Sequence, residues 1–165
     1  MAQVDAIPKD MHTITPNLTF RDAAKAIEFY KKAFGADEVM RMPSPDGKYI
    51  WHAELRIGDS IFYLNDEMPG SKTHAPTGDQ PATASLALHV EDCDSIFQRA
   101  KDAGAEPVMP VQEMFWGDRM GVMMDPFGHC WMIMTHTRDL TAEEIRRGGE
   151  EFARRMQAQQ RGAQT

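Results

Sequence analysis

The strongest constraint on this fold is an internal repeat. Residues 22–40 (DAAKAIEFYKKAFGADEVM) and residues 92–109 (DCDSIFQRAKDAGAEPVM) align when the second segment is moved back by 69 positions. The aligned segments share identical residues at Ile27 and Ile96, Lys32 and Lys101, Gly35 and Gly104, Ala36 and Ala105, and Met40 and Met109. A chain that repeats one supersecondary unit builds its core from the packed copies. The fold is therefore expected to contain two similar halves.

Each copy begins as a strand, a helix and a second strand. Strand-like runs precede the repeat, TITPNLTF at 13–20 and ASLALHV at 84–90. In both copies an aspartate stands where a helix N-cap is expected, and a glycine follows where a left-handed C-cap is expected. Between these caps the apolar residues recur at helical spacing. A short strand-like run follows each helix, so both copies start as β-α-β.

A hairpin completes each copy. Residues 50–57 (IWHAELRI) alternate between apolar and polar types, and Gly58-Asp59 predicts a type II′ turn before a returning strand at 60–66. In the second copy, runs at 119–124 and 129–134 flank Asp125-Pro126-Phe127-Gly128, which suits a type I turn. Each copy is therefore βαβββ, and the fold class is α+β. We assign a tail to residues 1–12, modules to 13–66 and 83–136, a linker loop to 67–82, and a C-terminal helix and tail to 137–165.

The C-terminal segment predicts one more helix. Thr141 followed by Glu144 is a capping-box pattern. Ile145, Phe152 and Met156 share one helical face, which has to pack either on this chain or on a second subunit. The pair at 148–149, Gly-Gly, weakens the middle of the helix.

Charge and composition exclude several classes of partner. With 18 basic and 25 acidic residues the net charge is -7, so the chain has no general attraction for nucleic acid or for an anionic membrane. No run is apolar and long enough to span a bilayer, and the first residues lack the apolar core of a secretory signal. Two cysteines, Cys93 and Cys130, are too few for a disulfide framework. We therefore expect a cytoplasmic protein with reduced thiols.

The repeat and its motifs resemble the vicinal oxygen chelate superfamily. That group includes glyoxalase I, extradiol dioxygenases, and bleomycin- and fosfomycin-resistance proteins. The resemblance rests on FRDAAKAIEFYKKAFGA at 20–36 and VEDCDSIFQRAKDAGA at 90–105, and it covers about residues 12–145. The run MFWGDRMGVMMDPFGHCWMIMTH at 114–136 is similar to the PhnB-like branch. The resemblance implies a cup-shaped mixed β-sheet with helices on its outer face, a small-molecule ligand and a homodimer.

The resemblance also makes a metal site testable position by position. Many members hold a divalent metal in the cup with a His and a Glu from each module. Counted from the neighbouring motifs, these four positions fall on Thr15, Tyr63, Ser85 and Met132. Hydroxyl and thioether groups are poor ligands for such metals. We therefore expect no metal and no other cofactor at the inherited site.

Strand alternation predicts which side chains face the cup. If Tyr63 faces it, then its cross-strand partner Glu54 does so too, and Trp51 belongs to the opposite, core face. The predicted ligand-binding set in this register is Asn17, Tyr63, Asn65, Ser85, Met132 and Met134.

Three of the cup-facing residues have chemistry of their own. His52, Glu54 and His89 could act as general acid and base, or as ligands of a displaced metal. The simpler alternative is a polar pair, His52 with Glu54, beside a solvent-filled cup. Cys130 also faces the cup, but nothing in the sequence lowers the pKa of its thiol, so we assign it no reaction.

Two more candidates lie in the loop that enters the seventh strand. Trp116 could stack on a flat ligand, and Arg119 could pair with a carboxylate or phosphate. The alternative is structural, with Trp116 filling the core and Asp118 bracing Arg119.

Two functions therefore compete at this level. The first is a small-molecule-binding protein without the family metal, similar to the bleomycin-resistance members. The second is an enzyme of the lyase, isomerase or dioxygenase type that uses His52, Glu54 and His89. A methyltransferase, a label sometimes given to the PhnB-like branch, has little support because the chain lacks a glycine-rich dinucleotide-type loop.

Overall fold

Two βαβββ modules and one additional helix make up the structure. It is a computed structural model, which describes residues 5–162 and the side chains of residues 5–158. The tail residues 1–4 and 163–165 lie outside the described residues. The elements are β1 (Asn17–Phe20), α1 (Ala23–Phe34), β2 (Asp37–Pro43), β3 (Ile50–Ile57), β4 (Ser60–Asp66), β5 (Ser85–His89), α2 (Cys93–Ala103), β6 (Glu106–Glu113), β7 (Asp118–Met124), β8 (Cys130–His136) and α3 (Ala142–Gly162).

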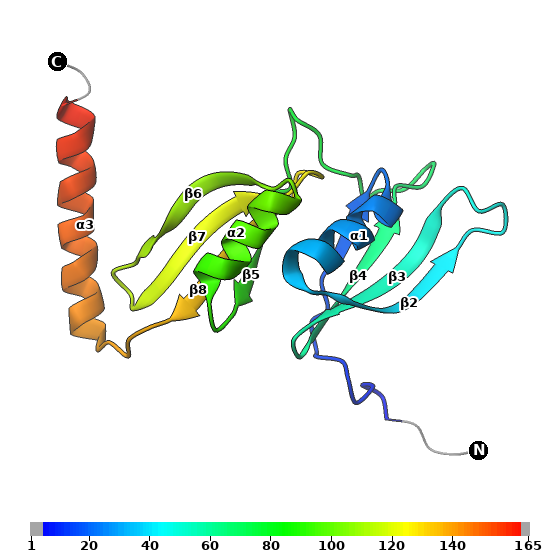
Figure 1. The fold of residues 1–165 in the computed structure, drawn as a ribbon, viewed down its shortest axis with the longest axis horizontal. Coiled ribbons are helices and arrows are strands. Elements are labelled where there is room, and N and C mark those ends of the chain that lie inside the picture. The colour runs from blue at the N-terminus through cyan, green and yellow to red at the C-terminus, as the bar shows by residue number, and fades with distance from the viewer. Residues whose placement is uncertain (1–4, 163–165) are drawn as a thin grey trace.

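The two modules have the same topology, as the repeat predicts. Each forms a four-stranded mixed sheet, in the order β1-β4-β3-β2 in the first module and β5-β8-β7-β6 in the second. The first strand of each module runs parallel to the last, and the other pairs are antiparallel. Helices α1 and α2 lie on the same side of the molecule, each over its own sheet (Figure 1). The α+β class and the glyoxalase-type arrangement are thus confirmed.

The sequence explains where both repeated helices begin and end. Asp22 accepts a hydrogen bond from the backbone of Lys25 at 3.0 Å, and Asp92 accepts one from Ser95 at the same distance. These aspartates satisfy N–H groups that have no partner inside the helix. At the other end Gly35 and Gly104 adopt left-handed conformations, which glycine reaches without a Cβ clash.

The hairpin of the first module has the predicted register, but one side chain is on the wrong face. Ile57 pairs with Ser60 and Glu54 with Tyr63. Trp51 was predicted to lie in the core, and it is 45% exposed. The pairing of β2 with β3 skips Trp51 at an irregularity, and Ile50 is buried in the core in its place. A bulge adds one residue to a strand and so shifts the alternation on one side of it.

A buried carboxylate joins the two modules. Asp125 accepts hydrogen bonds from the Tyr30 hydroxyl at 2.6 Å and from Trp131 Nε1 at 3.1 Å. It also accepts from the backbone of Phe127 and His129. Burial, followed by the Asp125 charge, raises the pKa of Tyr30, so this phenol stays a donor. The sequence predicted Asp125 only as a turn residue, whereas it also fixes the aromatic core between the modules.

Helix α3 stands at the far end of the second module (Figure 1). Thr141 and Glu144 form the predicted capping box, with Thr141 N 2.8 Å from Glu144 Oε2. The glycine pair has a packing role, because a Cβ on Gly148 would lie 2.9 Å from Phe115 Cβ. Among the described residues, no helix combines the length and hydrophobicity needed to cross a membrane.

Candidate ligand-binding surfaces

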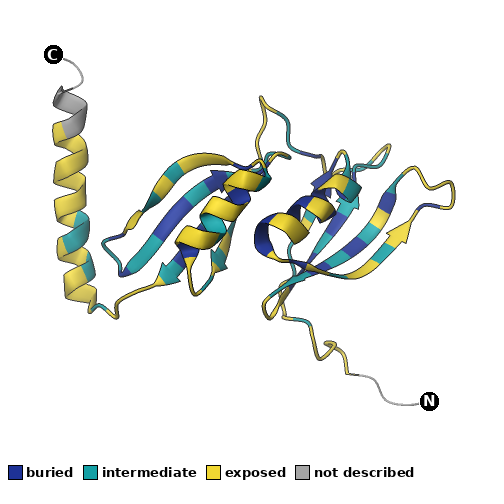
Figure 2. Cartoon of the chain, viewed as in Figure 1, coloured by how far each residue is buried: buried dark blue, intermediate teal, exposed yellow. Residues whose placement is uncertain are grey.

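Each sheet has one face covered by helix and one face that no helix of its own module covers. Figure 2 shows the consequence as alternating buried and less buried residues along the central strands. On the helix side of the first sheet, Ala53, Leu55 and Leu64 are fully buried. On the opposite face, Met42 pairs with His52, and Met40 and Tyr63 both pair with Glu54. These open faces are the candidate ligand-binding surfaces, and we call them the first and second concave faces.

The first concave face carries a polar group of three residues. His52 Nε2 lies 3.2 Å from Glu54 Oε1, and both side chains are partly buried. The His52 ring also meets the edge of Tyr63, with ring centroids 4.7 Å apart. The Tyr63 hydroxyl points to the Met11 sulfur at 3.6 Å, so the N-terminal segment reaches this face. A histidine paired with a carboxylate is a competent acid–base unit.

The third member of the predicted catalytic group is not part of this site. His89 lies on β5 and pairs with Met134 in the other sheet. It is exposed, and it lines a cavity at the module junction instead. Within residues 5–162, no group of three or more His, Cys, Asp or Glu side chains is arranged to hold a metal ion. Within one chain, the described residues therefore do not bring His52, Glu54 and His89 together as a displaced metal site.

The four positions that hold the metal in many superfamily members occupy equivalent places in the two modules of this chain, but none of them carries a His or Glu side chain. Asn17 pairs with Tyr63 in the first sheet, and Ala87 pairs with Met132 in the second. Thr15 and Ser85 are each two residues ahead of those partners, and Thr15 precedes the start of β1. A phenol, a thioether and two hydroxyls do not fit the divalent metal that the fold family implies.

The second concave face is rich in methionine. Met114, Met120 and Met134 form a buried cluster, against which Met109, Trp116, Val122 and Met132 pack. Met120 pairs directly with Met134, and Val122 pairs with Met132. Thioether side chains are flexible and polarisable, so they adapt to differently shaped apolar ligands. Cys130 lies on the same face, but burial raises the pKa of its thiol, which keeps it protonated.

Trp116 borders the methionine cluster and is held there by a chain of polar contacts. Its Nε1 donates to Asp118 Oδ2 at 2.8 Å, and Asp118 Oδ1 lies 2.8 Å from His136 Nδ1. The other ring nitrogen of His136 lies 3.0 Å from Asp139. These carboxylates, Asp118 first, raise the pKa of His136. Trp116 is therefore both packed and available at the rim of the second concave face.

Arg119 is not on the ligand side of the sheet. It pairs with Thr135, and its guanidinium makes two hydrogen bonds of 2.7 Å to the Asp94 carboxylate on α2. Adjacent residues of a strand point to opposite faces, so Asp118 faces the cup side and Arg119 the helix side. The predicted contact between Arg119 and a ligand is therefore corrected to an ion pair with α2. The predicted brace between Asp118 and Arg119 is also not formed in the described structure, where Asp118 bonds to Trp116 and His136 and Arg119 bonds to Asp94.

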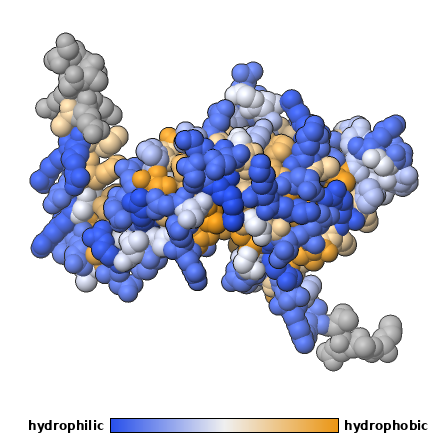
Figure 3. Space-filling view, in the orientation of Figure 1, coloured by the Kyte–Doolittle hydropathy of each residue, from blue (hydrophilic) through white to orange (hydrophobic). Residues whose placement is uncertain are grey.

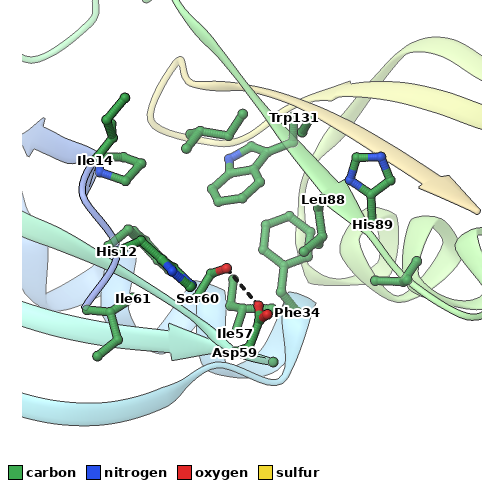
Figure 4. A pocket seen from close by; sticks show the side chains of 16 residues that line it. His12, Ile14, Phe34, Ile57, Asp59, Ser60, Ile61, Leu88, His89 and Trp131 are labelled. Carbon is green, nitrogen blue, oxygen red and sulfur yellow. Dashed lines mark hydrogen bonds between the residues drawn. The ribbon is translucent and has the colours of Figure 1, made fainter. Parts of the chain in front are cut away.

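One further cavity could not be predicted from the sequence. It lies where the modules meet, has a volume of about 590 Å³, and draws its walls from the N-terminal segment, the end of α1, the β3–β4 turn, β5 and β8. Figure 4 shows Trp131 and Phe34 on one side of it and His12 and Ile14 on the other. Five separate segments contribute, so no local motif could have marked it.

Comparisons with known proteins agree with this architecture. The family model "Glyoxalase/Bleomycin resistance protein/Dioxygenase superfamily" matches residues 11–133. An uncharacterized protein of Mycobacterium bovis, Mb0911c, is 45% identical over 135 residues, which is 80% of this chain and 88% of that protein.

Solved structures give the same result. TioX from Micromonospora sp. ML1 is 26% identical, with a TM-score of 0.61 over 76% of this chain and 98% of that one. The PhnB protein from Bacillus cereus, at 21% identity, shares the fold with a TM-score of 0.58 over 75% of this chain and 99% of that one. The family match ends at residue 133, so α3 lies outside the matched residues.

Proposed function

Because this chain belongs to the glyoxalase, bleomycin resistance protein and dioxygenase superfamily, we propose that it binds a small apolar molecule on its concave faces without the metal common in that superfamily. The observation that carries the proposal is the makeup of the second concave face. Met109, Val122, Met132 and Trp116 are partly buried on this face and pack against the buried Met114, Met120 and Met134. Ligand sites are mostly apolar, with a few polar groups that orient the ligand.

The first concave face supplies the polar groups for this proposal. Tyr63, His52 and Glu54 lie together there, and each can hydrogen-bond to a ligand. An apolar face and a polar face suit an amphipathic ligand with a hydrophobic body and one or two polar groups.

A homodimer would bring two such faces together. Met40, Met42 and Trp51 are exposed at 41%, 47% and 45%, and large exposed apolar groups commonly mark interaction sites. In a twofold dimer the first concave face of one copy can lie over the second concave face of the other, and the reciprocal pair forms by symmetry. Light scattering at micromolar concentration is expected to give twice the chain mass of 18.6 kDa, and a monomer would contradict this part of the proposal.

An acid–base enzyme is the second candidate function. It is favoured by one observation, the 3.2 Å approach of His52 Nε2 to Glu54 Oε1 beside the Tyr63 ring. The substitution His52→Gln keeps hydrogen bonding but removes the imidazole that would act as the general acid or base. Unchanged ligand affinity with loss of turnover would favour the enzyme, and unchanged affinity with no turnover in either protein would favour binding alone.

The location we propose is the cytoplasm. Cys93 and Cys130 are both free thiols, and unpaired cysteines suit a reducing compartment.

The test of the binding function is a screen of apolar and amphipathic small molecules in the presence of a chelator. A hit is expected to lose affinity in Met132→Ser, because the substitution replaces a polarisable apolar contact by a hydroxyl. Met68→Ser is the matched control, since Met68 is similarly half-buried but lies in the linker. Equal affinity in both variants, or binding that a chelator abolishes, would contradict the proposal.

A further inference from the structure

The cavity at the module junction borders the concave faces through Ile61 on β4 and through Ala87 and His89 on β5, but its walls include neither the methionine cluster nor the pair of His52 with Glu54. Its walls include Phe34, Ile57, Leu88 and Trp131, and all four belong to or pack against the hydrophobic core. Its volume of about 590 Å³ is within the range of small-molecule sites. Figure 3 shows hydrophobic side chains gathered in the middle of the molecule, where the modules meet.

The inner side of the junction cavity is aromatic. The rings of Phe34 and Trp131 lie with centroids 4.7 Å apart and planes inclined at 48°. Trp131 has no free donor for a ligand, since its Nε1 already donates to Asp125. These rings therefore supply hydrophobic contact and no hydrogen bond.

Asp59 is the one acidic residue among the described residues at the rim of the junction cavity. Asp59 lies in the β3–β4 turn and accepts a hydrogen bond from the Ser60 hydroxyl at 2.8 Å. The lining includes two imidazoles, from His12 and His89, and it includes no lysine or arginine. A carboxylate without a neighbouring cation in the lining favours a ligand head that is positively charged and donates hydrogen bonds.

One wall of the junction cavity is an exposed isoleucine on the N-terminal segment. Ile14 is 84% exposed although it faces the cavity (Figure 4). The segment is fixed on both sides of Ile14, because Tyr63 N donates to Pro16 O at 2.8 Å and the Tyr63 hydroxyl contacts Met11. A ligand in the cavity would remove this side chain from water, which is favourable in proportion to the apolar area covered.

We propose that the junction cavity binds an apolar amine, with its hydrocarbon part against Phe34, Trp131 and Ile14 and its ammonium group at Asp59. This site is independent of the proposed function, because its walls exclude the methionine cluster and the pair of His52 with Glu54. The chain thus has a second ligand site, selected by charge as well as by hydrophobicity.

The experiment compares decylamine with decanoate, which share chain length and differ in the sign of the head-group charge. Isothermal titration calorimetry below the micelle concentration is expected to show about fivefold tighter binding of decylamine, the scale of one partly exposed ion pair. Asp59→Asn is expected to remove this difference, and Asp79→Asn, exposed and outside the cavity, is expected to keep it. Equal affinities for the two probes in the unmodified protein would overturn the proposal.

A second pair of variants tests the position of the hydrocarbon. Ile14→Ala is expected to weaken decylamine about fivefold to tenfold, because it removes three carbons from one wall. Ile7→Ala is the matched control, since Ile7 is exposed on the same segment and does not line the cavity. If Met132→Ser weakens decylamine and Ile14→Ala does not, the amine binds at a concave face and the junction site is refuted. If only Ile14→Ala and Asp59→Asn have an effect, the junction site stands even where no ligand for the concave faces is found.

Discussion

Gly148→Ala gives a prediction whose sign depends on the tertiary structure. In an isolated helix, alanine is more favourable than glycine by about 1 kcal/mol. In this protein the new methyl group would lie 2.9 Å from Phe115 Cβ and 3.2 Å from the Phe115 carbonyl oxygen. Both are atoms of a packed loop, which cannot move as the end of a long side chain can. Overpacking of this kind costs about 1–3 kcal/mol, so the net effect on the docking of α3 is unfavourable by up to about 2 kcal/mol.

Hydrogen exchange and circular dichroism separate the two contributions. A peptide of residues 137–162 is expected to become more helical with Gly148→Ala, whereas in the full chain the amides of α3 are expected to exchange faster. Gly149→Ala is the matched control, because its Cβ would lie 3.3 Å from the edge of the Phe115 ring, which can give by a few tenths of an ångström. Slower exchange in the full-length Gly148→Ala protein would refute the packing argument.

Three other predictions follow from named contacts. Tyr30→Phe is expected to lower the free energy of unfolding by about 1.5–3 kcal/mol in urea, because it removes a donor from the buried Asp125 carboxylate; Tyr49→Phe is the control, and equal effects would contradict this. His136 has a raised pKa because of its carboxylate partners, so its contribution to the free energy of unfolding is present below its unfolded pKa and is lost as pH rises through the folded pKa. The difference in stability between the unmodified protein and His136→Gln is therefore expected to shrink from pH 5.5 to pH 8.5. A difference that stays constant over this range would contradict the prediction. Arg119→Ala is expected to affect stability and leave ligand affinity unchanged, since Arg119 bonds to α2; a loss of affinity measured by calorimetry would return it to the binding site.

The helix caps, the strands and the hairpin turn could be predicted from the sequence because each depends on a short local pattern. The caps at Asp22 and Gly35, the alternation of 50–57 and the turn at Gly58 each depend on a few neighbouring residues. Gly58 has a φ of 59°, as the first position of a type II′ turn requires. Because the whole unit occurs twice, each local pattern was supported by its counterpart in the other module.

The errors arose where a residue depends on distant packing. Trp51 was misplaced because a bulge against β2 is not visible in an alternating sequence. The position of Arg119 at the entry to a strand predicts contact with a ligand, whereas its partner, Asp94, is 25 residues away on α2. His52 and Glu54 lie on the sheet of the first module and His89 on that of the second, so alternation alone could not say how near they lie. Alternation gives the face of one strand, and it does not place two sheets relative to each other.

Gly148 and Gly149 are a second case in which the role of a residue depends on a distant contact. By helix propensity alone they weaken α3. The structure gives them a role, because Phe115 approaches the helix where a side chain would otherwise stand. The sequence could not name that partner, which is 33 residues earlier in a loop.

We propose that this member of the superfamily works without the metal common in it, and a metal titration can decide the question. The chelator-treated protein would be titrated with Mn²⁺, Ni²⁺, Zn²⁺ and Fe²⁺ under anaerobic conditions, with elemental analysis of the protein as purified. Because Thr15, Tyr63, Ser85 and Met132 occupy the ligand positions, we predict no stoichiometric metal and no site tighter than about 100 μM, or roughly −5.5 kcal/mol. One metal ion per chain at micromolar affinity, lost in Tyr63→Phe or Met132→Ser, would contradict the account.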